Sequence, residues 1–367
     1  MDIAVIVGTR PEAIKCAPVI HALRAANLST HVLSTGQHRE LLHTALADFD
    51  LTADSDLALM RDEQTLPELT ARLMEALPPA LAKLAPKLVI VQGDTTTAFV
   101  GALAAYYGKL PCAHVEAGLR SGNRMAPWPE ELNRRLADQL CTRHYAPTEC
   151  AQTALLREGI DASSIMVTGQ TGVDAALWMS RKLADNQPPD VAAIHLPAGL
   201  RLVYATGHRR ESLTDGGLAR VAAALADIAR EFPDVAVVYP VHPNPAVQRQ
   251  ITQLLGLTRV HVIAPLSYAG SIWMMRNASV IVSDSGGIQE EAPSFGVRVL
   301  VTRGETERPE GVAAGFLRVV GTDKEAILGN LRETLRYPPQ HLKGKANPYG
   351  DGKAGERIAK DVRKLLK

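Results

Sequence analysis

Short β-branched runs alternate with longer Ala- and Leu-rich segments along almost the whole chain, in two successive series. The apolar, β-branched runs are typical of buried strands, and the segments between them are long enough for helices. Strands and helices that alternate in this way form parallel sheets covered by helices on both faces. The expected strands are 3–7, 31–34, 88–91, 112–115 and 165–167 in the first series, and 202–205, 236–239, 260–263, 280–282 and 299–301 in the second.

A proline-rich segment separates the two series. Residues 186–190 read Asn-Gln-Pro-Pro-Asp and residues 196–199 read Leu-Pro-Ala-Gly, which is typical of a linker. At 367 residues the chain is also too long for one ordinary domain. We therefore predict an α/β fold with two doubly wound, Rossmann-like parallel-sheet domains, at 1–170 and 171–352, followed by an amphipathic helix at 353–367.

Composition and charge exclude several classes of protein. The net charge of +1 gives no electrostatic reason to expect a nucleic acid or an anionic membrane as partner. No apolar run is long enough to span a bilayer, and the N-terminus has the pattern of a strand instead of a signal peptide. The four cysteines lack CxxC spacing, so we expect reduced, buried thiols in a cytoplasmic protein.

Polar residues follow the expected strands with unusual regularity. In open parallel sheets, ligands bind beyond the carboxyl ends of the strands. We therefore expect the two sheets to face each other across a cleft lined by an excess of cations, which suits a diphosphate. The cations at these strand ends are Arg10, Lys15, Arg210, His242 and Arg308.

The segment 283–292 shows the same arrangement in more detail. Ser285, Gly286 and Gly287 follow an apolar strand, and a helix is expected to begin near Ile288. Free N–H groups at a helix start favour a phosphate, and the carboxylates that follow can accept hydrogen bonds from sugar hydroxyls. These residues alone leave two interpretations open: a nucleotide site, or a glycine turn with solvated glutamates.

Single residues in the other strand-end segments also leave alternatives open. Asp94 could be a helix N-cap, and Glu130 with Arg134 could form a solvated helical ion pair. His242 could be a structural histidine. The segment 8–12 is neither a dinucleotide fingerprint nor a P-loop, so NAD and Walker-type ATP binding are unsupported. The functional interpretation is favoured because Asp94, Glu116 and His208 all follow strands whose ends should face one cleft.

Taken together, these segments resemble the bacterial non-hydrolysing UDP-N-acetylglucosamine 2-epimerases over nearly the whole chain. That resemblance implies the two-domain arrangement of the GT-B glycosyltransferases, a last helix that packs on the first domain, a homodimer, and no metal or nicotinamide cofactor. The matching motifs are GTRPEAIK at 8–15, GQHRE at 36–40, GDTTT at 93–97, HVEAGLR at 114–120, PWPEE at 127–131, GHRRE at 207–211, YPVH at 239–242, SGGIQEE at 285–291, TERPE at 306–310 and NPYGDG at 347–352.

The resemblance also implies a reaction and a set of residues for it. The family converts UDP-GlcNAc reversibly into UDP-ManNAc: UDP leaves from C1 as the C2 proton departs, and then adds back with the proton delivered to the other face. The product feeds cell-surface polysaccharide biosynthesis. The catalytic residues implied are Asp94, Glu116, Glu130 and His208. The substrate-binding residues implied are Arg10, Lys15, Arg134, Arg210, His242, Ser285, Gly286, Gly287, Glu291 and Arg308.

Two features of the family stay open in this chain. Leu266 and Ser271 replace a Gln and a Phe of some relatives near the uridine, which leaves the uracil contacts unassigned. A second, allosteric UDP-GlcNAc site matches at Gln37, Arg210 and His242, but Glu40 and Glu63 replace a Gln and an Arg there. The rival functions are a hydrolysing epimerase, a GT-B glycosyltransferase and a catalytically inactive nucleotide-sugar binder.

Overall fold

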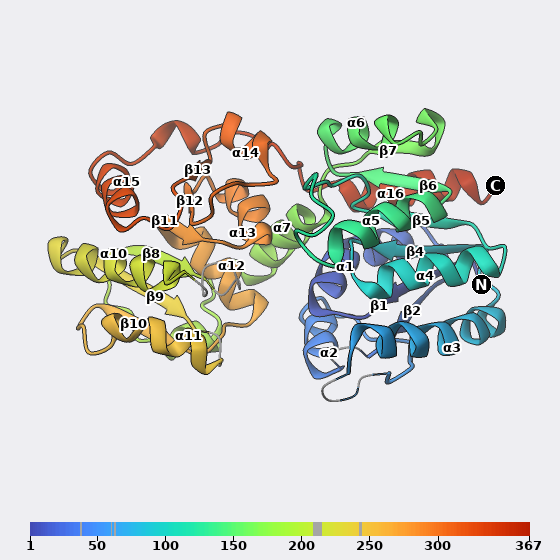
Figure 1. Cartoon of the computed structure of the whole chain (residues 1–367), viewed down its shortest axis with the longest axis horizontal. Helices are drawn as coiled ribbons and strands as arrows, with labels where there is room; N and C mark the ends of the chain where they lie inside the picture. Colours follow the sequence, from blue (N-terminus) through green and yellow to red (C-terminus); the bar gives the residue numbers. More distant parts are fainter. Residues whose placement is uncertain (37–38, 60, 62–63, 208–214, 242–243) are drawn as a thin grey trace. The chain divides into compact units, whose positions relative to one another are not determined.

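The computed structural model describes residues 1–36, 39–59, 61, 64–207, 215–241 and 244–367, without the side chains of Arg39 and Glu40. The chain forms two compact units, and each contains one parallel sheet flanked by helices (Figure 1). Unit 1 comprises Met1–Trp178 and Tyr349–Lys367, and unit 2 comprises Met179–Pro348.

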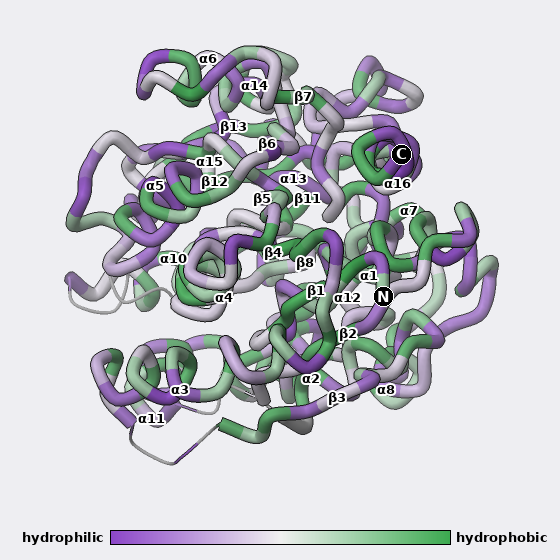
Figure 2. Tube along the Cα trace, turned by 90° about the vertical axis from the view of Figure 1, so that its right-hand side faces the viewer, coloured by the Kyte–Doolittle hydropathy of each residue, from purple (hydrophilic) through white to green (hydrophobic). Residues whose placement is uncertain are grey.

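Unit 1 contains a seven-stranded sheet in the order β3-β2-β1-β4-β5-β6-β7, in which every pair is parallel. Its central strands are fully buried and apolar, and much of β1 and β4 is green in Figure 2. The strands are β1 (Ile3–Val7), β2 (Thr30–Ser34), β3 (Ser55–Asp56), β4 (Leu88–Gln92), β5 (Cys112–Val115), β6 (Arg143–Ala146) and β7 (Ile165–Val167). The helices are α1 (Arg10–Ala25), α2 (Arg39–Asp48), α3 (Leu66–Leu84), α4 (Thr96–Tyr107), α5 (Glu130–Leu140), α6 (Glu149–Arg157) and α16 (Ala354–Leu365), together with the first part of α7 (Thr171–Leu183).

Unit 2 contains a six-stranded parallel sheet in the order β10-β9-β8-β11-β12-β13. Its core joins the apolar strands to the buried faces of α10 and α15. The strands are β8 (Arg201–Thr206), β9 (Val235–Pro240), β10 (Val260–Ile263), β11 (Ala278–Ser283), β12 (Val299–Val301) and β13 (Leu317–Val319). The helices are α8 (Pro189–Ala192), α10 (Gly217–Glu231), α11 (Pro245–Gln250), α12 (Tyr268–Asn277), α13 (Gly286–Glu291), α14 (Pro309–Ala313) and α15 (Lys324–Arg336).

The predicted α/β class with two doubly wound sheets is confirmed, and all ten expected strands are present. Strands β3, β6 and β13 were not predicted. Strand β6 was missed because Arg143 and His144 look like surface residues. In the structure, Asp361 accepts hydrogen bonds from Arg143 Nε (2.7 Å) and Tyr145 Oη (3.0 Å), which satisfies the polar atoms of this strand.

The proline-rich segment after α7 is part of unit 2. Pro189–Ala192 forms α8, Val191 is buried, and the Asp190 carboxylate accepts a hydrogen bond from Ser267 N at 2.7 Å. The chain passes from unit 1 to unit 2 inside α7 and returns between Pro348 and Tyr349. Charge-assisted contacts therefore hold in place a segment whose composition is typical of a linker.

The expectation of four buried cysteines is wrong for one of them. Cys16, Cys112 and Cys141 are buried free thiols, but Cys150 is exposed. Cys150 lies on α6, whose buried side chains are Ala151 and Leu155, so position 150 falls on the solvent side of that amphipathic helix. Within the described ranges, no helix is both long enough and apolar enough to cross a membrane.

The last helix, α16, packs on α1 within unit 1. The approach is close: a Cβ on Gly355 would lie 2.7 Å from the carbonyl oxygen of Pro18, so only glycine fits there. The N-cap residue Lys353 provides no side-chain cap, and Asp174 on α7 accepts a hydrogen bond from Gly355 N at 2.8 Å instead. A carboxylate from another helix thus satisfies the first turn of α16.

We expect Asp174 to make unit 1 less stable as the pH rises from about 4 to 7. Burial raises the pKa of Asp174 to about 6, although the backbone hydrogen bonds from Gly355 and Ala354 oppose this shift. A raised carboxyl pKa contributes stability that is complete below the unfolded value near 3.8 and is lost as the pH passes through the folded value. Between pH 4 and 7 this effect should lower the free energy of unfolding of the wild type by about 2–3 kcal/mol, and the Asp174→Asn variant should not show that decrease.

Urea unfolding at pH 4, 5, 6 and 7 measures this difference. The exposed Asp185 provides the control, because Asp185→Asn removes a carboxylate that is not buried. Identical pH profiles for wild type and Asp174→Asn would contradict the role assigned to Asp174.

Candidate active site

The loop after β1 is tied to the loop after β4 by one buried carboxylate, Glu12. Its Oε2 accepts hydrogen bonds from Gly8 N (2.9 Å), Thr9 N (2.6 Å) and Thr9 Oγ1 (2.8 Å), which completes a capping box at the start of α1. Its Oε1 accepts a hydrogen bond from Thr95 Oγ1 at 2.6 Å. Thr95 is the N-cap of α4 and follows Asp94, so Glu12 links two strand ends of the predicted site.

Glu116 lies directly after β5, with 9% of its surface exposed. Its Oε2 is 2.6 Å from Lys15 Nζ and accepts a hydrogen bond from Gln92 Nε2 at 2.7 Å. Its backbone has φ of +70°, in the left-handed region that non-glycine residues rarely adopt. In this conformation the backbone N–H groups of Glu116 and Ala117 both donate to the carbonyl of Tyr145. A strained backbone held by several contacts is common at functional sites.

Asp94 lies after β4 and is held by two residues of α5. Arg134 forms an ion pair with its carboxylate, and Asn133 Nδ2 donates to its main-chain oxygen at 3.0 Å. Arg134 also contacts Glu131 at 3.3 Å and is 6% exposed, so the interpretation of Arg134 as part of a solvated helical ion pair is wrong. Glu130 is the first residue of α5 and is half-buried.

In this structure, two residues predicted to bind substrate contact the predicted catalytic carboxylates. Lys15 pairs with Glu116, and Arg134 pairs with Asp94. Each ion pair fixes the direction of its carboxylate. Gln92 and Glu12 belong to polar segments that follow predicted strands, but the sequence assigned neither of them a role. The structure shows that Gln92, the last residue of β4, contacts Glu116.

In unit 2, Arg308 joins α13 to the segment before α14. Its Nε and one terminal nitrogen donate to Glu290 Oε1 at 3.0 and 2.7 Å, and its other terminal nitrogen donates to Glu307 at 2.7 Å. A Cβ on Gly286 would lie 2.8 Å from this guanidinium, so a larger residue there would require Arg308 to shift. Arg308, predicted to bind substrate, is thus anchored by two carboxylates here.

The helix at the predicted phosphate site begins earlier than expected. α13 starts at Gly286, two positions before Ile288, with Ser285 as its N-cap residue. Glu290 and Glu291 are 2% and 7% exposed. The alternative of a glycine turn with solvated glutamates is therefore wrong. Gly287 lies in the first turn of this helix.

Of the remaining predicted residues, some have described positions and others do not. Arg10 is the first residue of α1 and is half-buried. Leu266 is buried, and Ser271 Oγ lies 3.1 Å from the Tyr204 hydroxyl oxygen, so that serine takes part in a contact inside unit 2. Among the described residues, no three His, Cys, Asp or Glu side chains are grouped to hold a metal ion. Gln37, His208, Arg210 and His242 lie outside the described residues.

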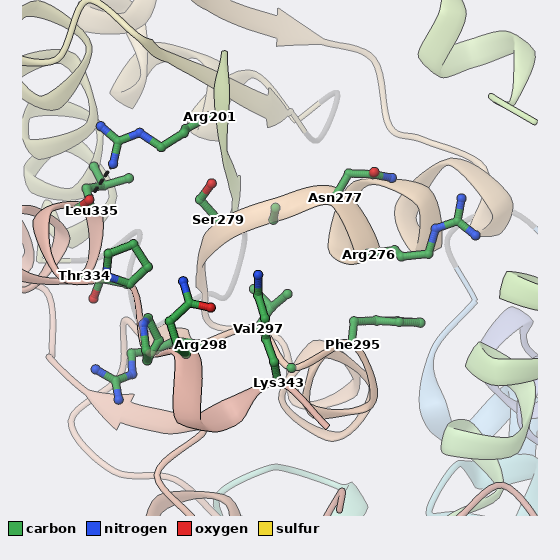
Figure 3. A pocket seen from close by; sticks show the side chains of 15 residues that line it. Arg201, Arg276, Asn277, Ser279, Phe295, Val297, Arg298, Thr334, Leu335 and Lys343 are labelled. Carbon is green, nitrogen blue, oxygen red and sulfur yellow. Dashed lines mark hydrogen bonds between the residues drawn. The ribbon is translucent and has the colours of Figure 1, made fainter. Parts of the chain in front are cut away.

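A separate hollow of about 450 Å³ lies at the amino ends of β8, β11 and β12 (Figure 3). It is therefore at the opposite edge of the unit 2 sheet from Ser285 and Gly286. Arg201 pairs with Asp234 at 2.8 Å and donates to the carbonyl of Leu335 near the end of α15. Arg276 lies in the last turn of α12. Cations at helix C-termini stabilise those ends, so a structural role accounts for these two arginines.

The fold and these residues define a two-unit α/β protein with paired carboxylates and cations at the carboxyl ends of its parallel strands. Residues 21–363 match the family model described as UDP-N-acetylglucosamine 2-epimerase. The chain is 44% identical to the UDP-N-acetylglucosamine 2-epimerase of Escherichia coli K12, with 98% of this chain and 97% of that protein covered.

Solved structures give the same result. The crystal structure of UDP-GlcNAc 2-epimerase from Neisseria meningitidis bound to UDP-GlcNAc has a TM-score of 0.93 and 40% identity, and covers 99% of this chain and 100% of that one. The Methanocaldococcus jannaschii UDP-GlcNAc 2-epimerase in complex with UDP-GlcNAc and UDP has a TM-score of 0.83 and 33% identity, with 99% and 100% covered. The chain belongs to the UDP-N-acetylglucosamine 2-epimerase family, and its activity is that of an isomerase of UDP-GlcNAc.

Proposed function

We propose that the chain interconverts UDP-GlcNAc and UDP-ManNAc by elimination and re-addition of UDP. The C2 proton of the sugar is not beside a carbonyl, so direct deprotonation would give an anion without stabilisation. Departure of UDP from C1 as the proton leaves C2 avoids that anion and gives a neutral 2-acetamidoglucal. UDP then adds back at C1 while a proton arrives on the other face of C2.

The observation that supports this route best is the pair of carboxylates at neighbouring strand ends in unit 1. Asp94 follows β4 and Glu116 follows β5, two strands that are adjacent in the sheet. Each carboxylate has its own cation, Arg134 or Lys15. A reaction that removes a proton from one face and returns it to the other needs two such groups. Glu130, at the start of α5, is the third carboxylate that we assign to proton transfer or positioning.

The leaving UDP must be held by groups that stabilise its charge. Negative charge builds on UDP as the C1–O bond breaks, so backbone N–H groups and cations that hold the diphosphate stabilise the transition state. Ser285 and the N–H groups of Gly286 and Gly287 would bind phosphate, and the buried Glu291 would accept hydrogen bonds from the ribose hydroxyls. Arg10, Arg308 and the residues His208, Arg210 and His242 would bind or order the diphosphate.

Proton NMR of UDP-GlcNAc with the protein in deuterated buffer tests this function. We expect UDP-ManNAc to form with deuterium at C2, and deuterium to enter the UDP-GlcNAc pool as well. Free ManNAc with UDP as the main product would show a hydrolysing epimerase. An unchanged spectrum without an acceptor would show a glycosyltransferase or a binding protein, and either outcome would overturn the proposal.

A further inference from the structure

The imidazole of His114 is completely buried between the strand ends of the site and α5. Its Nε2 is 2.7 Å from the main-chain oxygen of Gly93, the residue before Asp94, and its Nδ1 is 2.6 Å from Asp138 Oδ1. Neither the His114 nor the Asp138 side chain is exposed to solvent. Asp138 Oδ2 accepts hydrogen bonds from Gly118 N (3.3 Å) and an Arg120 terminal nitrogen (2.7 Å).

The partners of His114 determine where its protons lie. A carbonyl oxygen can only accept, so Nε2 must carry a proton that it donates to Gly93. Asp138 accepts from a cation and a backbone N–H on its other oxygen, which favours the carboxylate over the acid. An ionised Asp138 must likewise accept from Nδ1. Both ring nitrogens then donate, and His114 is an imidazolium.

The charges around His114 agree with this assignment. They are Asp138 from α5, Arg120 from the segment after β5, and His144 from β6. Burial lowers the pKa of His114, but the charge and hydrogen bond of Asp138 and the Gly93 carbonyl outweigh it, so the pKa is raised. The pKa of His144 is lowered, mainly by burial. Two neighbouring histidines are thus expected to differ in charge at neutral pH.

We propose that His114 is a charged positioning residue for proton transfer, which fixes the Gly93–Asp94 turn through Nε2 and the segment after Glu116 through Asp138. Gly93 has φ of +73°, so the direction of Asp94 depends on a turn that needs a fixed anchor. Asp138 holds Gly118 and Arg120, two and four residues after Glu116. This role rests on the proton-transfer function proposed above for Asp94 and Glu116.

The charge of His114 can be measured without an activity assay. In the full-length protein labelled with ¹⁵N-histidine, both ring nitrogens of His114 should be protonated at pH 7, where His144 should be neutral. The His114→Gln variant assigns the signal by its loss. A neutral His114 ring at pH 7 would overturn the proposal, whatever the outcome of the deuterium experiment.

Kinetics of His114→Gln test the positioning role. Misplacement of Asp94 should lower kcat on the order of 100-fold with little change in KM. Loss of the buried cation should also alter the pH profile of kcat, because a nearby charge shifts the pKa values of its neighbours. The control is His21→Gln on α1. The His21 ring lies 2.7 Å from Phe49 O, which is not part of the candidate site. This variant should retain both kcat and the pH profile.

A second variant covers the case in which His114→Gln does not fold. Asp138→Asn keeps the shape of the side chain but removes the charge that stabilises the imidazolium. Its His114 signals should become those of a neutral ring, and kcat should fall as in His114→Gln. A folded variant of either residue with wild-type kcat and pH profile would overturn the positioning role. In that case, deuterium incorporation by the wild type would still decide the proposed reaction.

Discussion

Replacement of Glu116 by Gln should lower kcat roughly 10²- to 10⁴-fold, the range for loss of a positioned acid or base. The amide has the same shape as the carboxylate but cannot take up or release a proton at C2. Glu116 is held by Lys15 at 2.6 Å and Gln92 at 2.7 Å, and its backbone is strained, which indicates that its direction matters. The rate of UDP-ManNAc formation, followed by proton NMR, measures the loss.

The matched control is Glu149→Gln, in the first turn of α6. Glu149 is exposed, and its replacement by Gln makes the same chemical change outside the candidate site. Its kcat should equal that of the wild type. A Glu116→Gln protein that melts like the wild type and keeps more than a tenth of its kcat would contradict a proton-transfer role for Glu116.

Replacement of Glu12 by Ala should destabilise unit 1 by about 3–5 kcal/mol. The buried helix cap is lost, and the groups that donate to Glu12 are left without an acceptor. Glu12 is 1% exposed and accepts four hydrogen bonds, from Gly8 N, Thr9 N, Thr9 Oγ1 and Thr95 Oγ1. Alanine would leave these donors without their acceptor at a buried to half-buried site. Thermal unfolding followed by circular dichroism measures the effect.

The chain provides its own control for this prediction. Thr65 and Glu68 form a second capping box at the start of α3, with the same hydrogen bonds at an exposed site. There water can replace the lost acceptor, so Glu68→Ala should cost only about 1 kcal/mol. Equal losses for Glu12→Ala and Glu68→Ala would show that the link from Glu12 to Thr95 adds nothing to stability.

The strands could be predicted because apolar β-branched runs such as Ile3–Val7 have few alternatives to a buried strand. The same rule failed for β6, where Arg143 and His144 are satisfied by Asp361 and by the Asp138 carbonyl. Asp361 lies 218 residues from Arg143 in the chain. Local pattern carries no information about partners so distant in sequence, so a polar strand of this kind escapes prediction.

In the candidate site, too, the positions of residues could be predicted but their contacts could not. The position of Asp94 and Glu116 after adjacent strands follows from the alternation of strands and helices. The sequence did not indicate that Lys15 pairs with Glu116, or that Arg308 is held by Glu290 and Glu307. Long cationic side chains reach several neighbouring segments, and only the packed structure decides which carboxylate they contact.

The most direct test of the account is whether the bond between C1 and the diphosphate oxygen breaks during turnover. UDP-GlcNAc with ¹⁸O in that bridging position can be incubated with the protein and the label followed by ³¹P NMR of the β-phosphate. Elimination releases UDP, so we predict that the label moves into the non-bridging oxygens while UDP-ManNAc forms. A label that stays in the bridge while C2 exchanges its proton for deuterium would contradict elimination and re-addition.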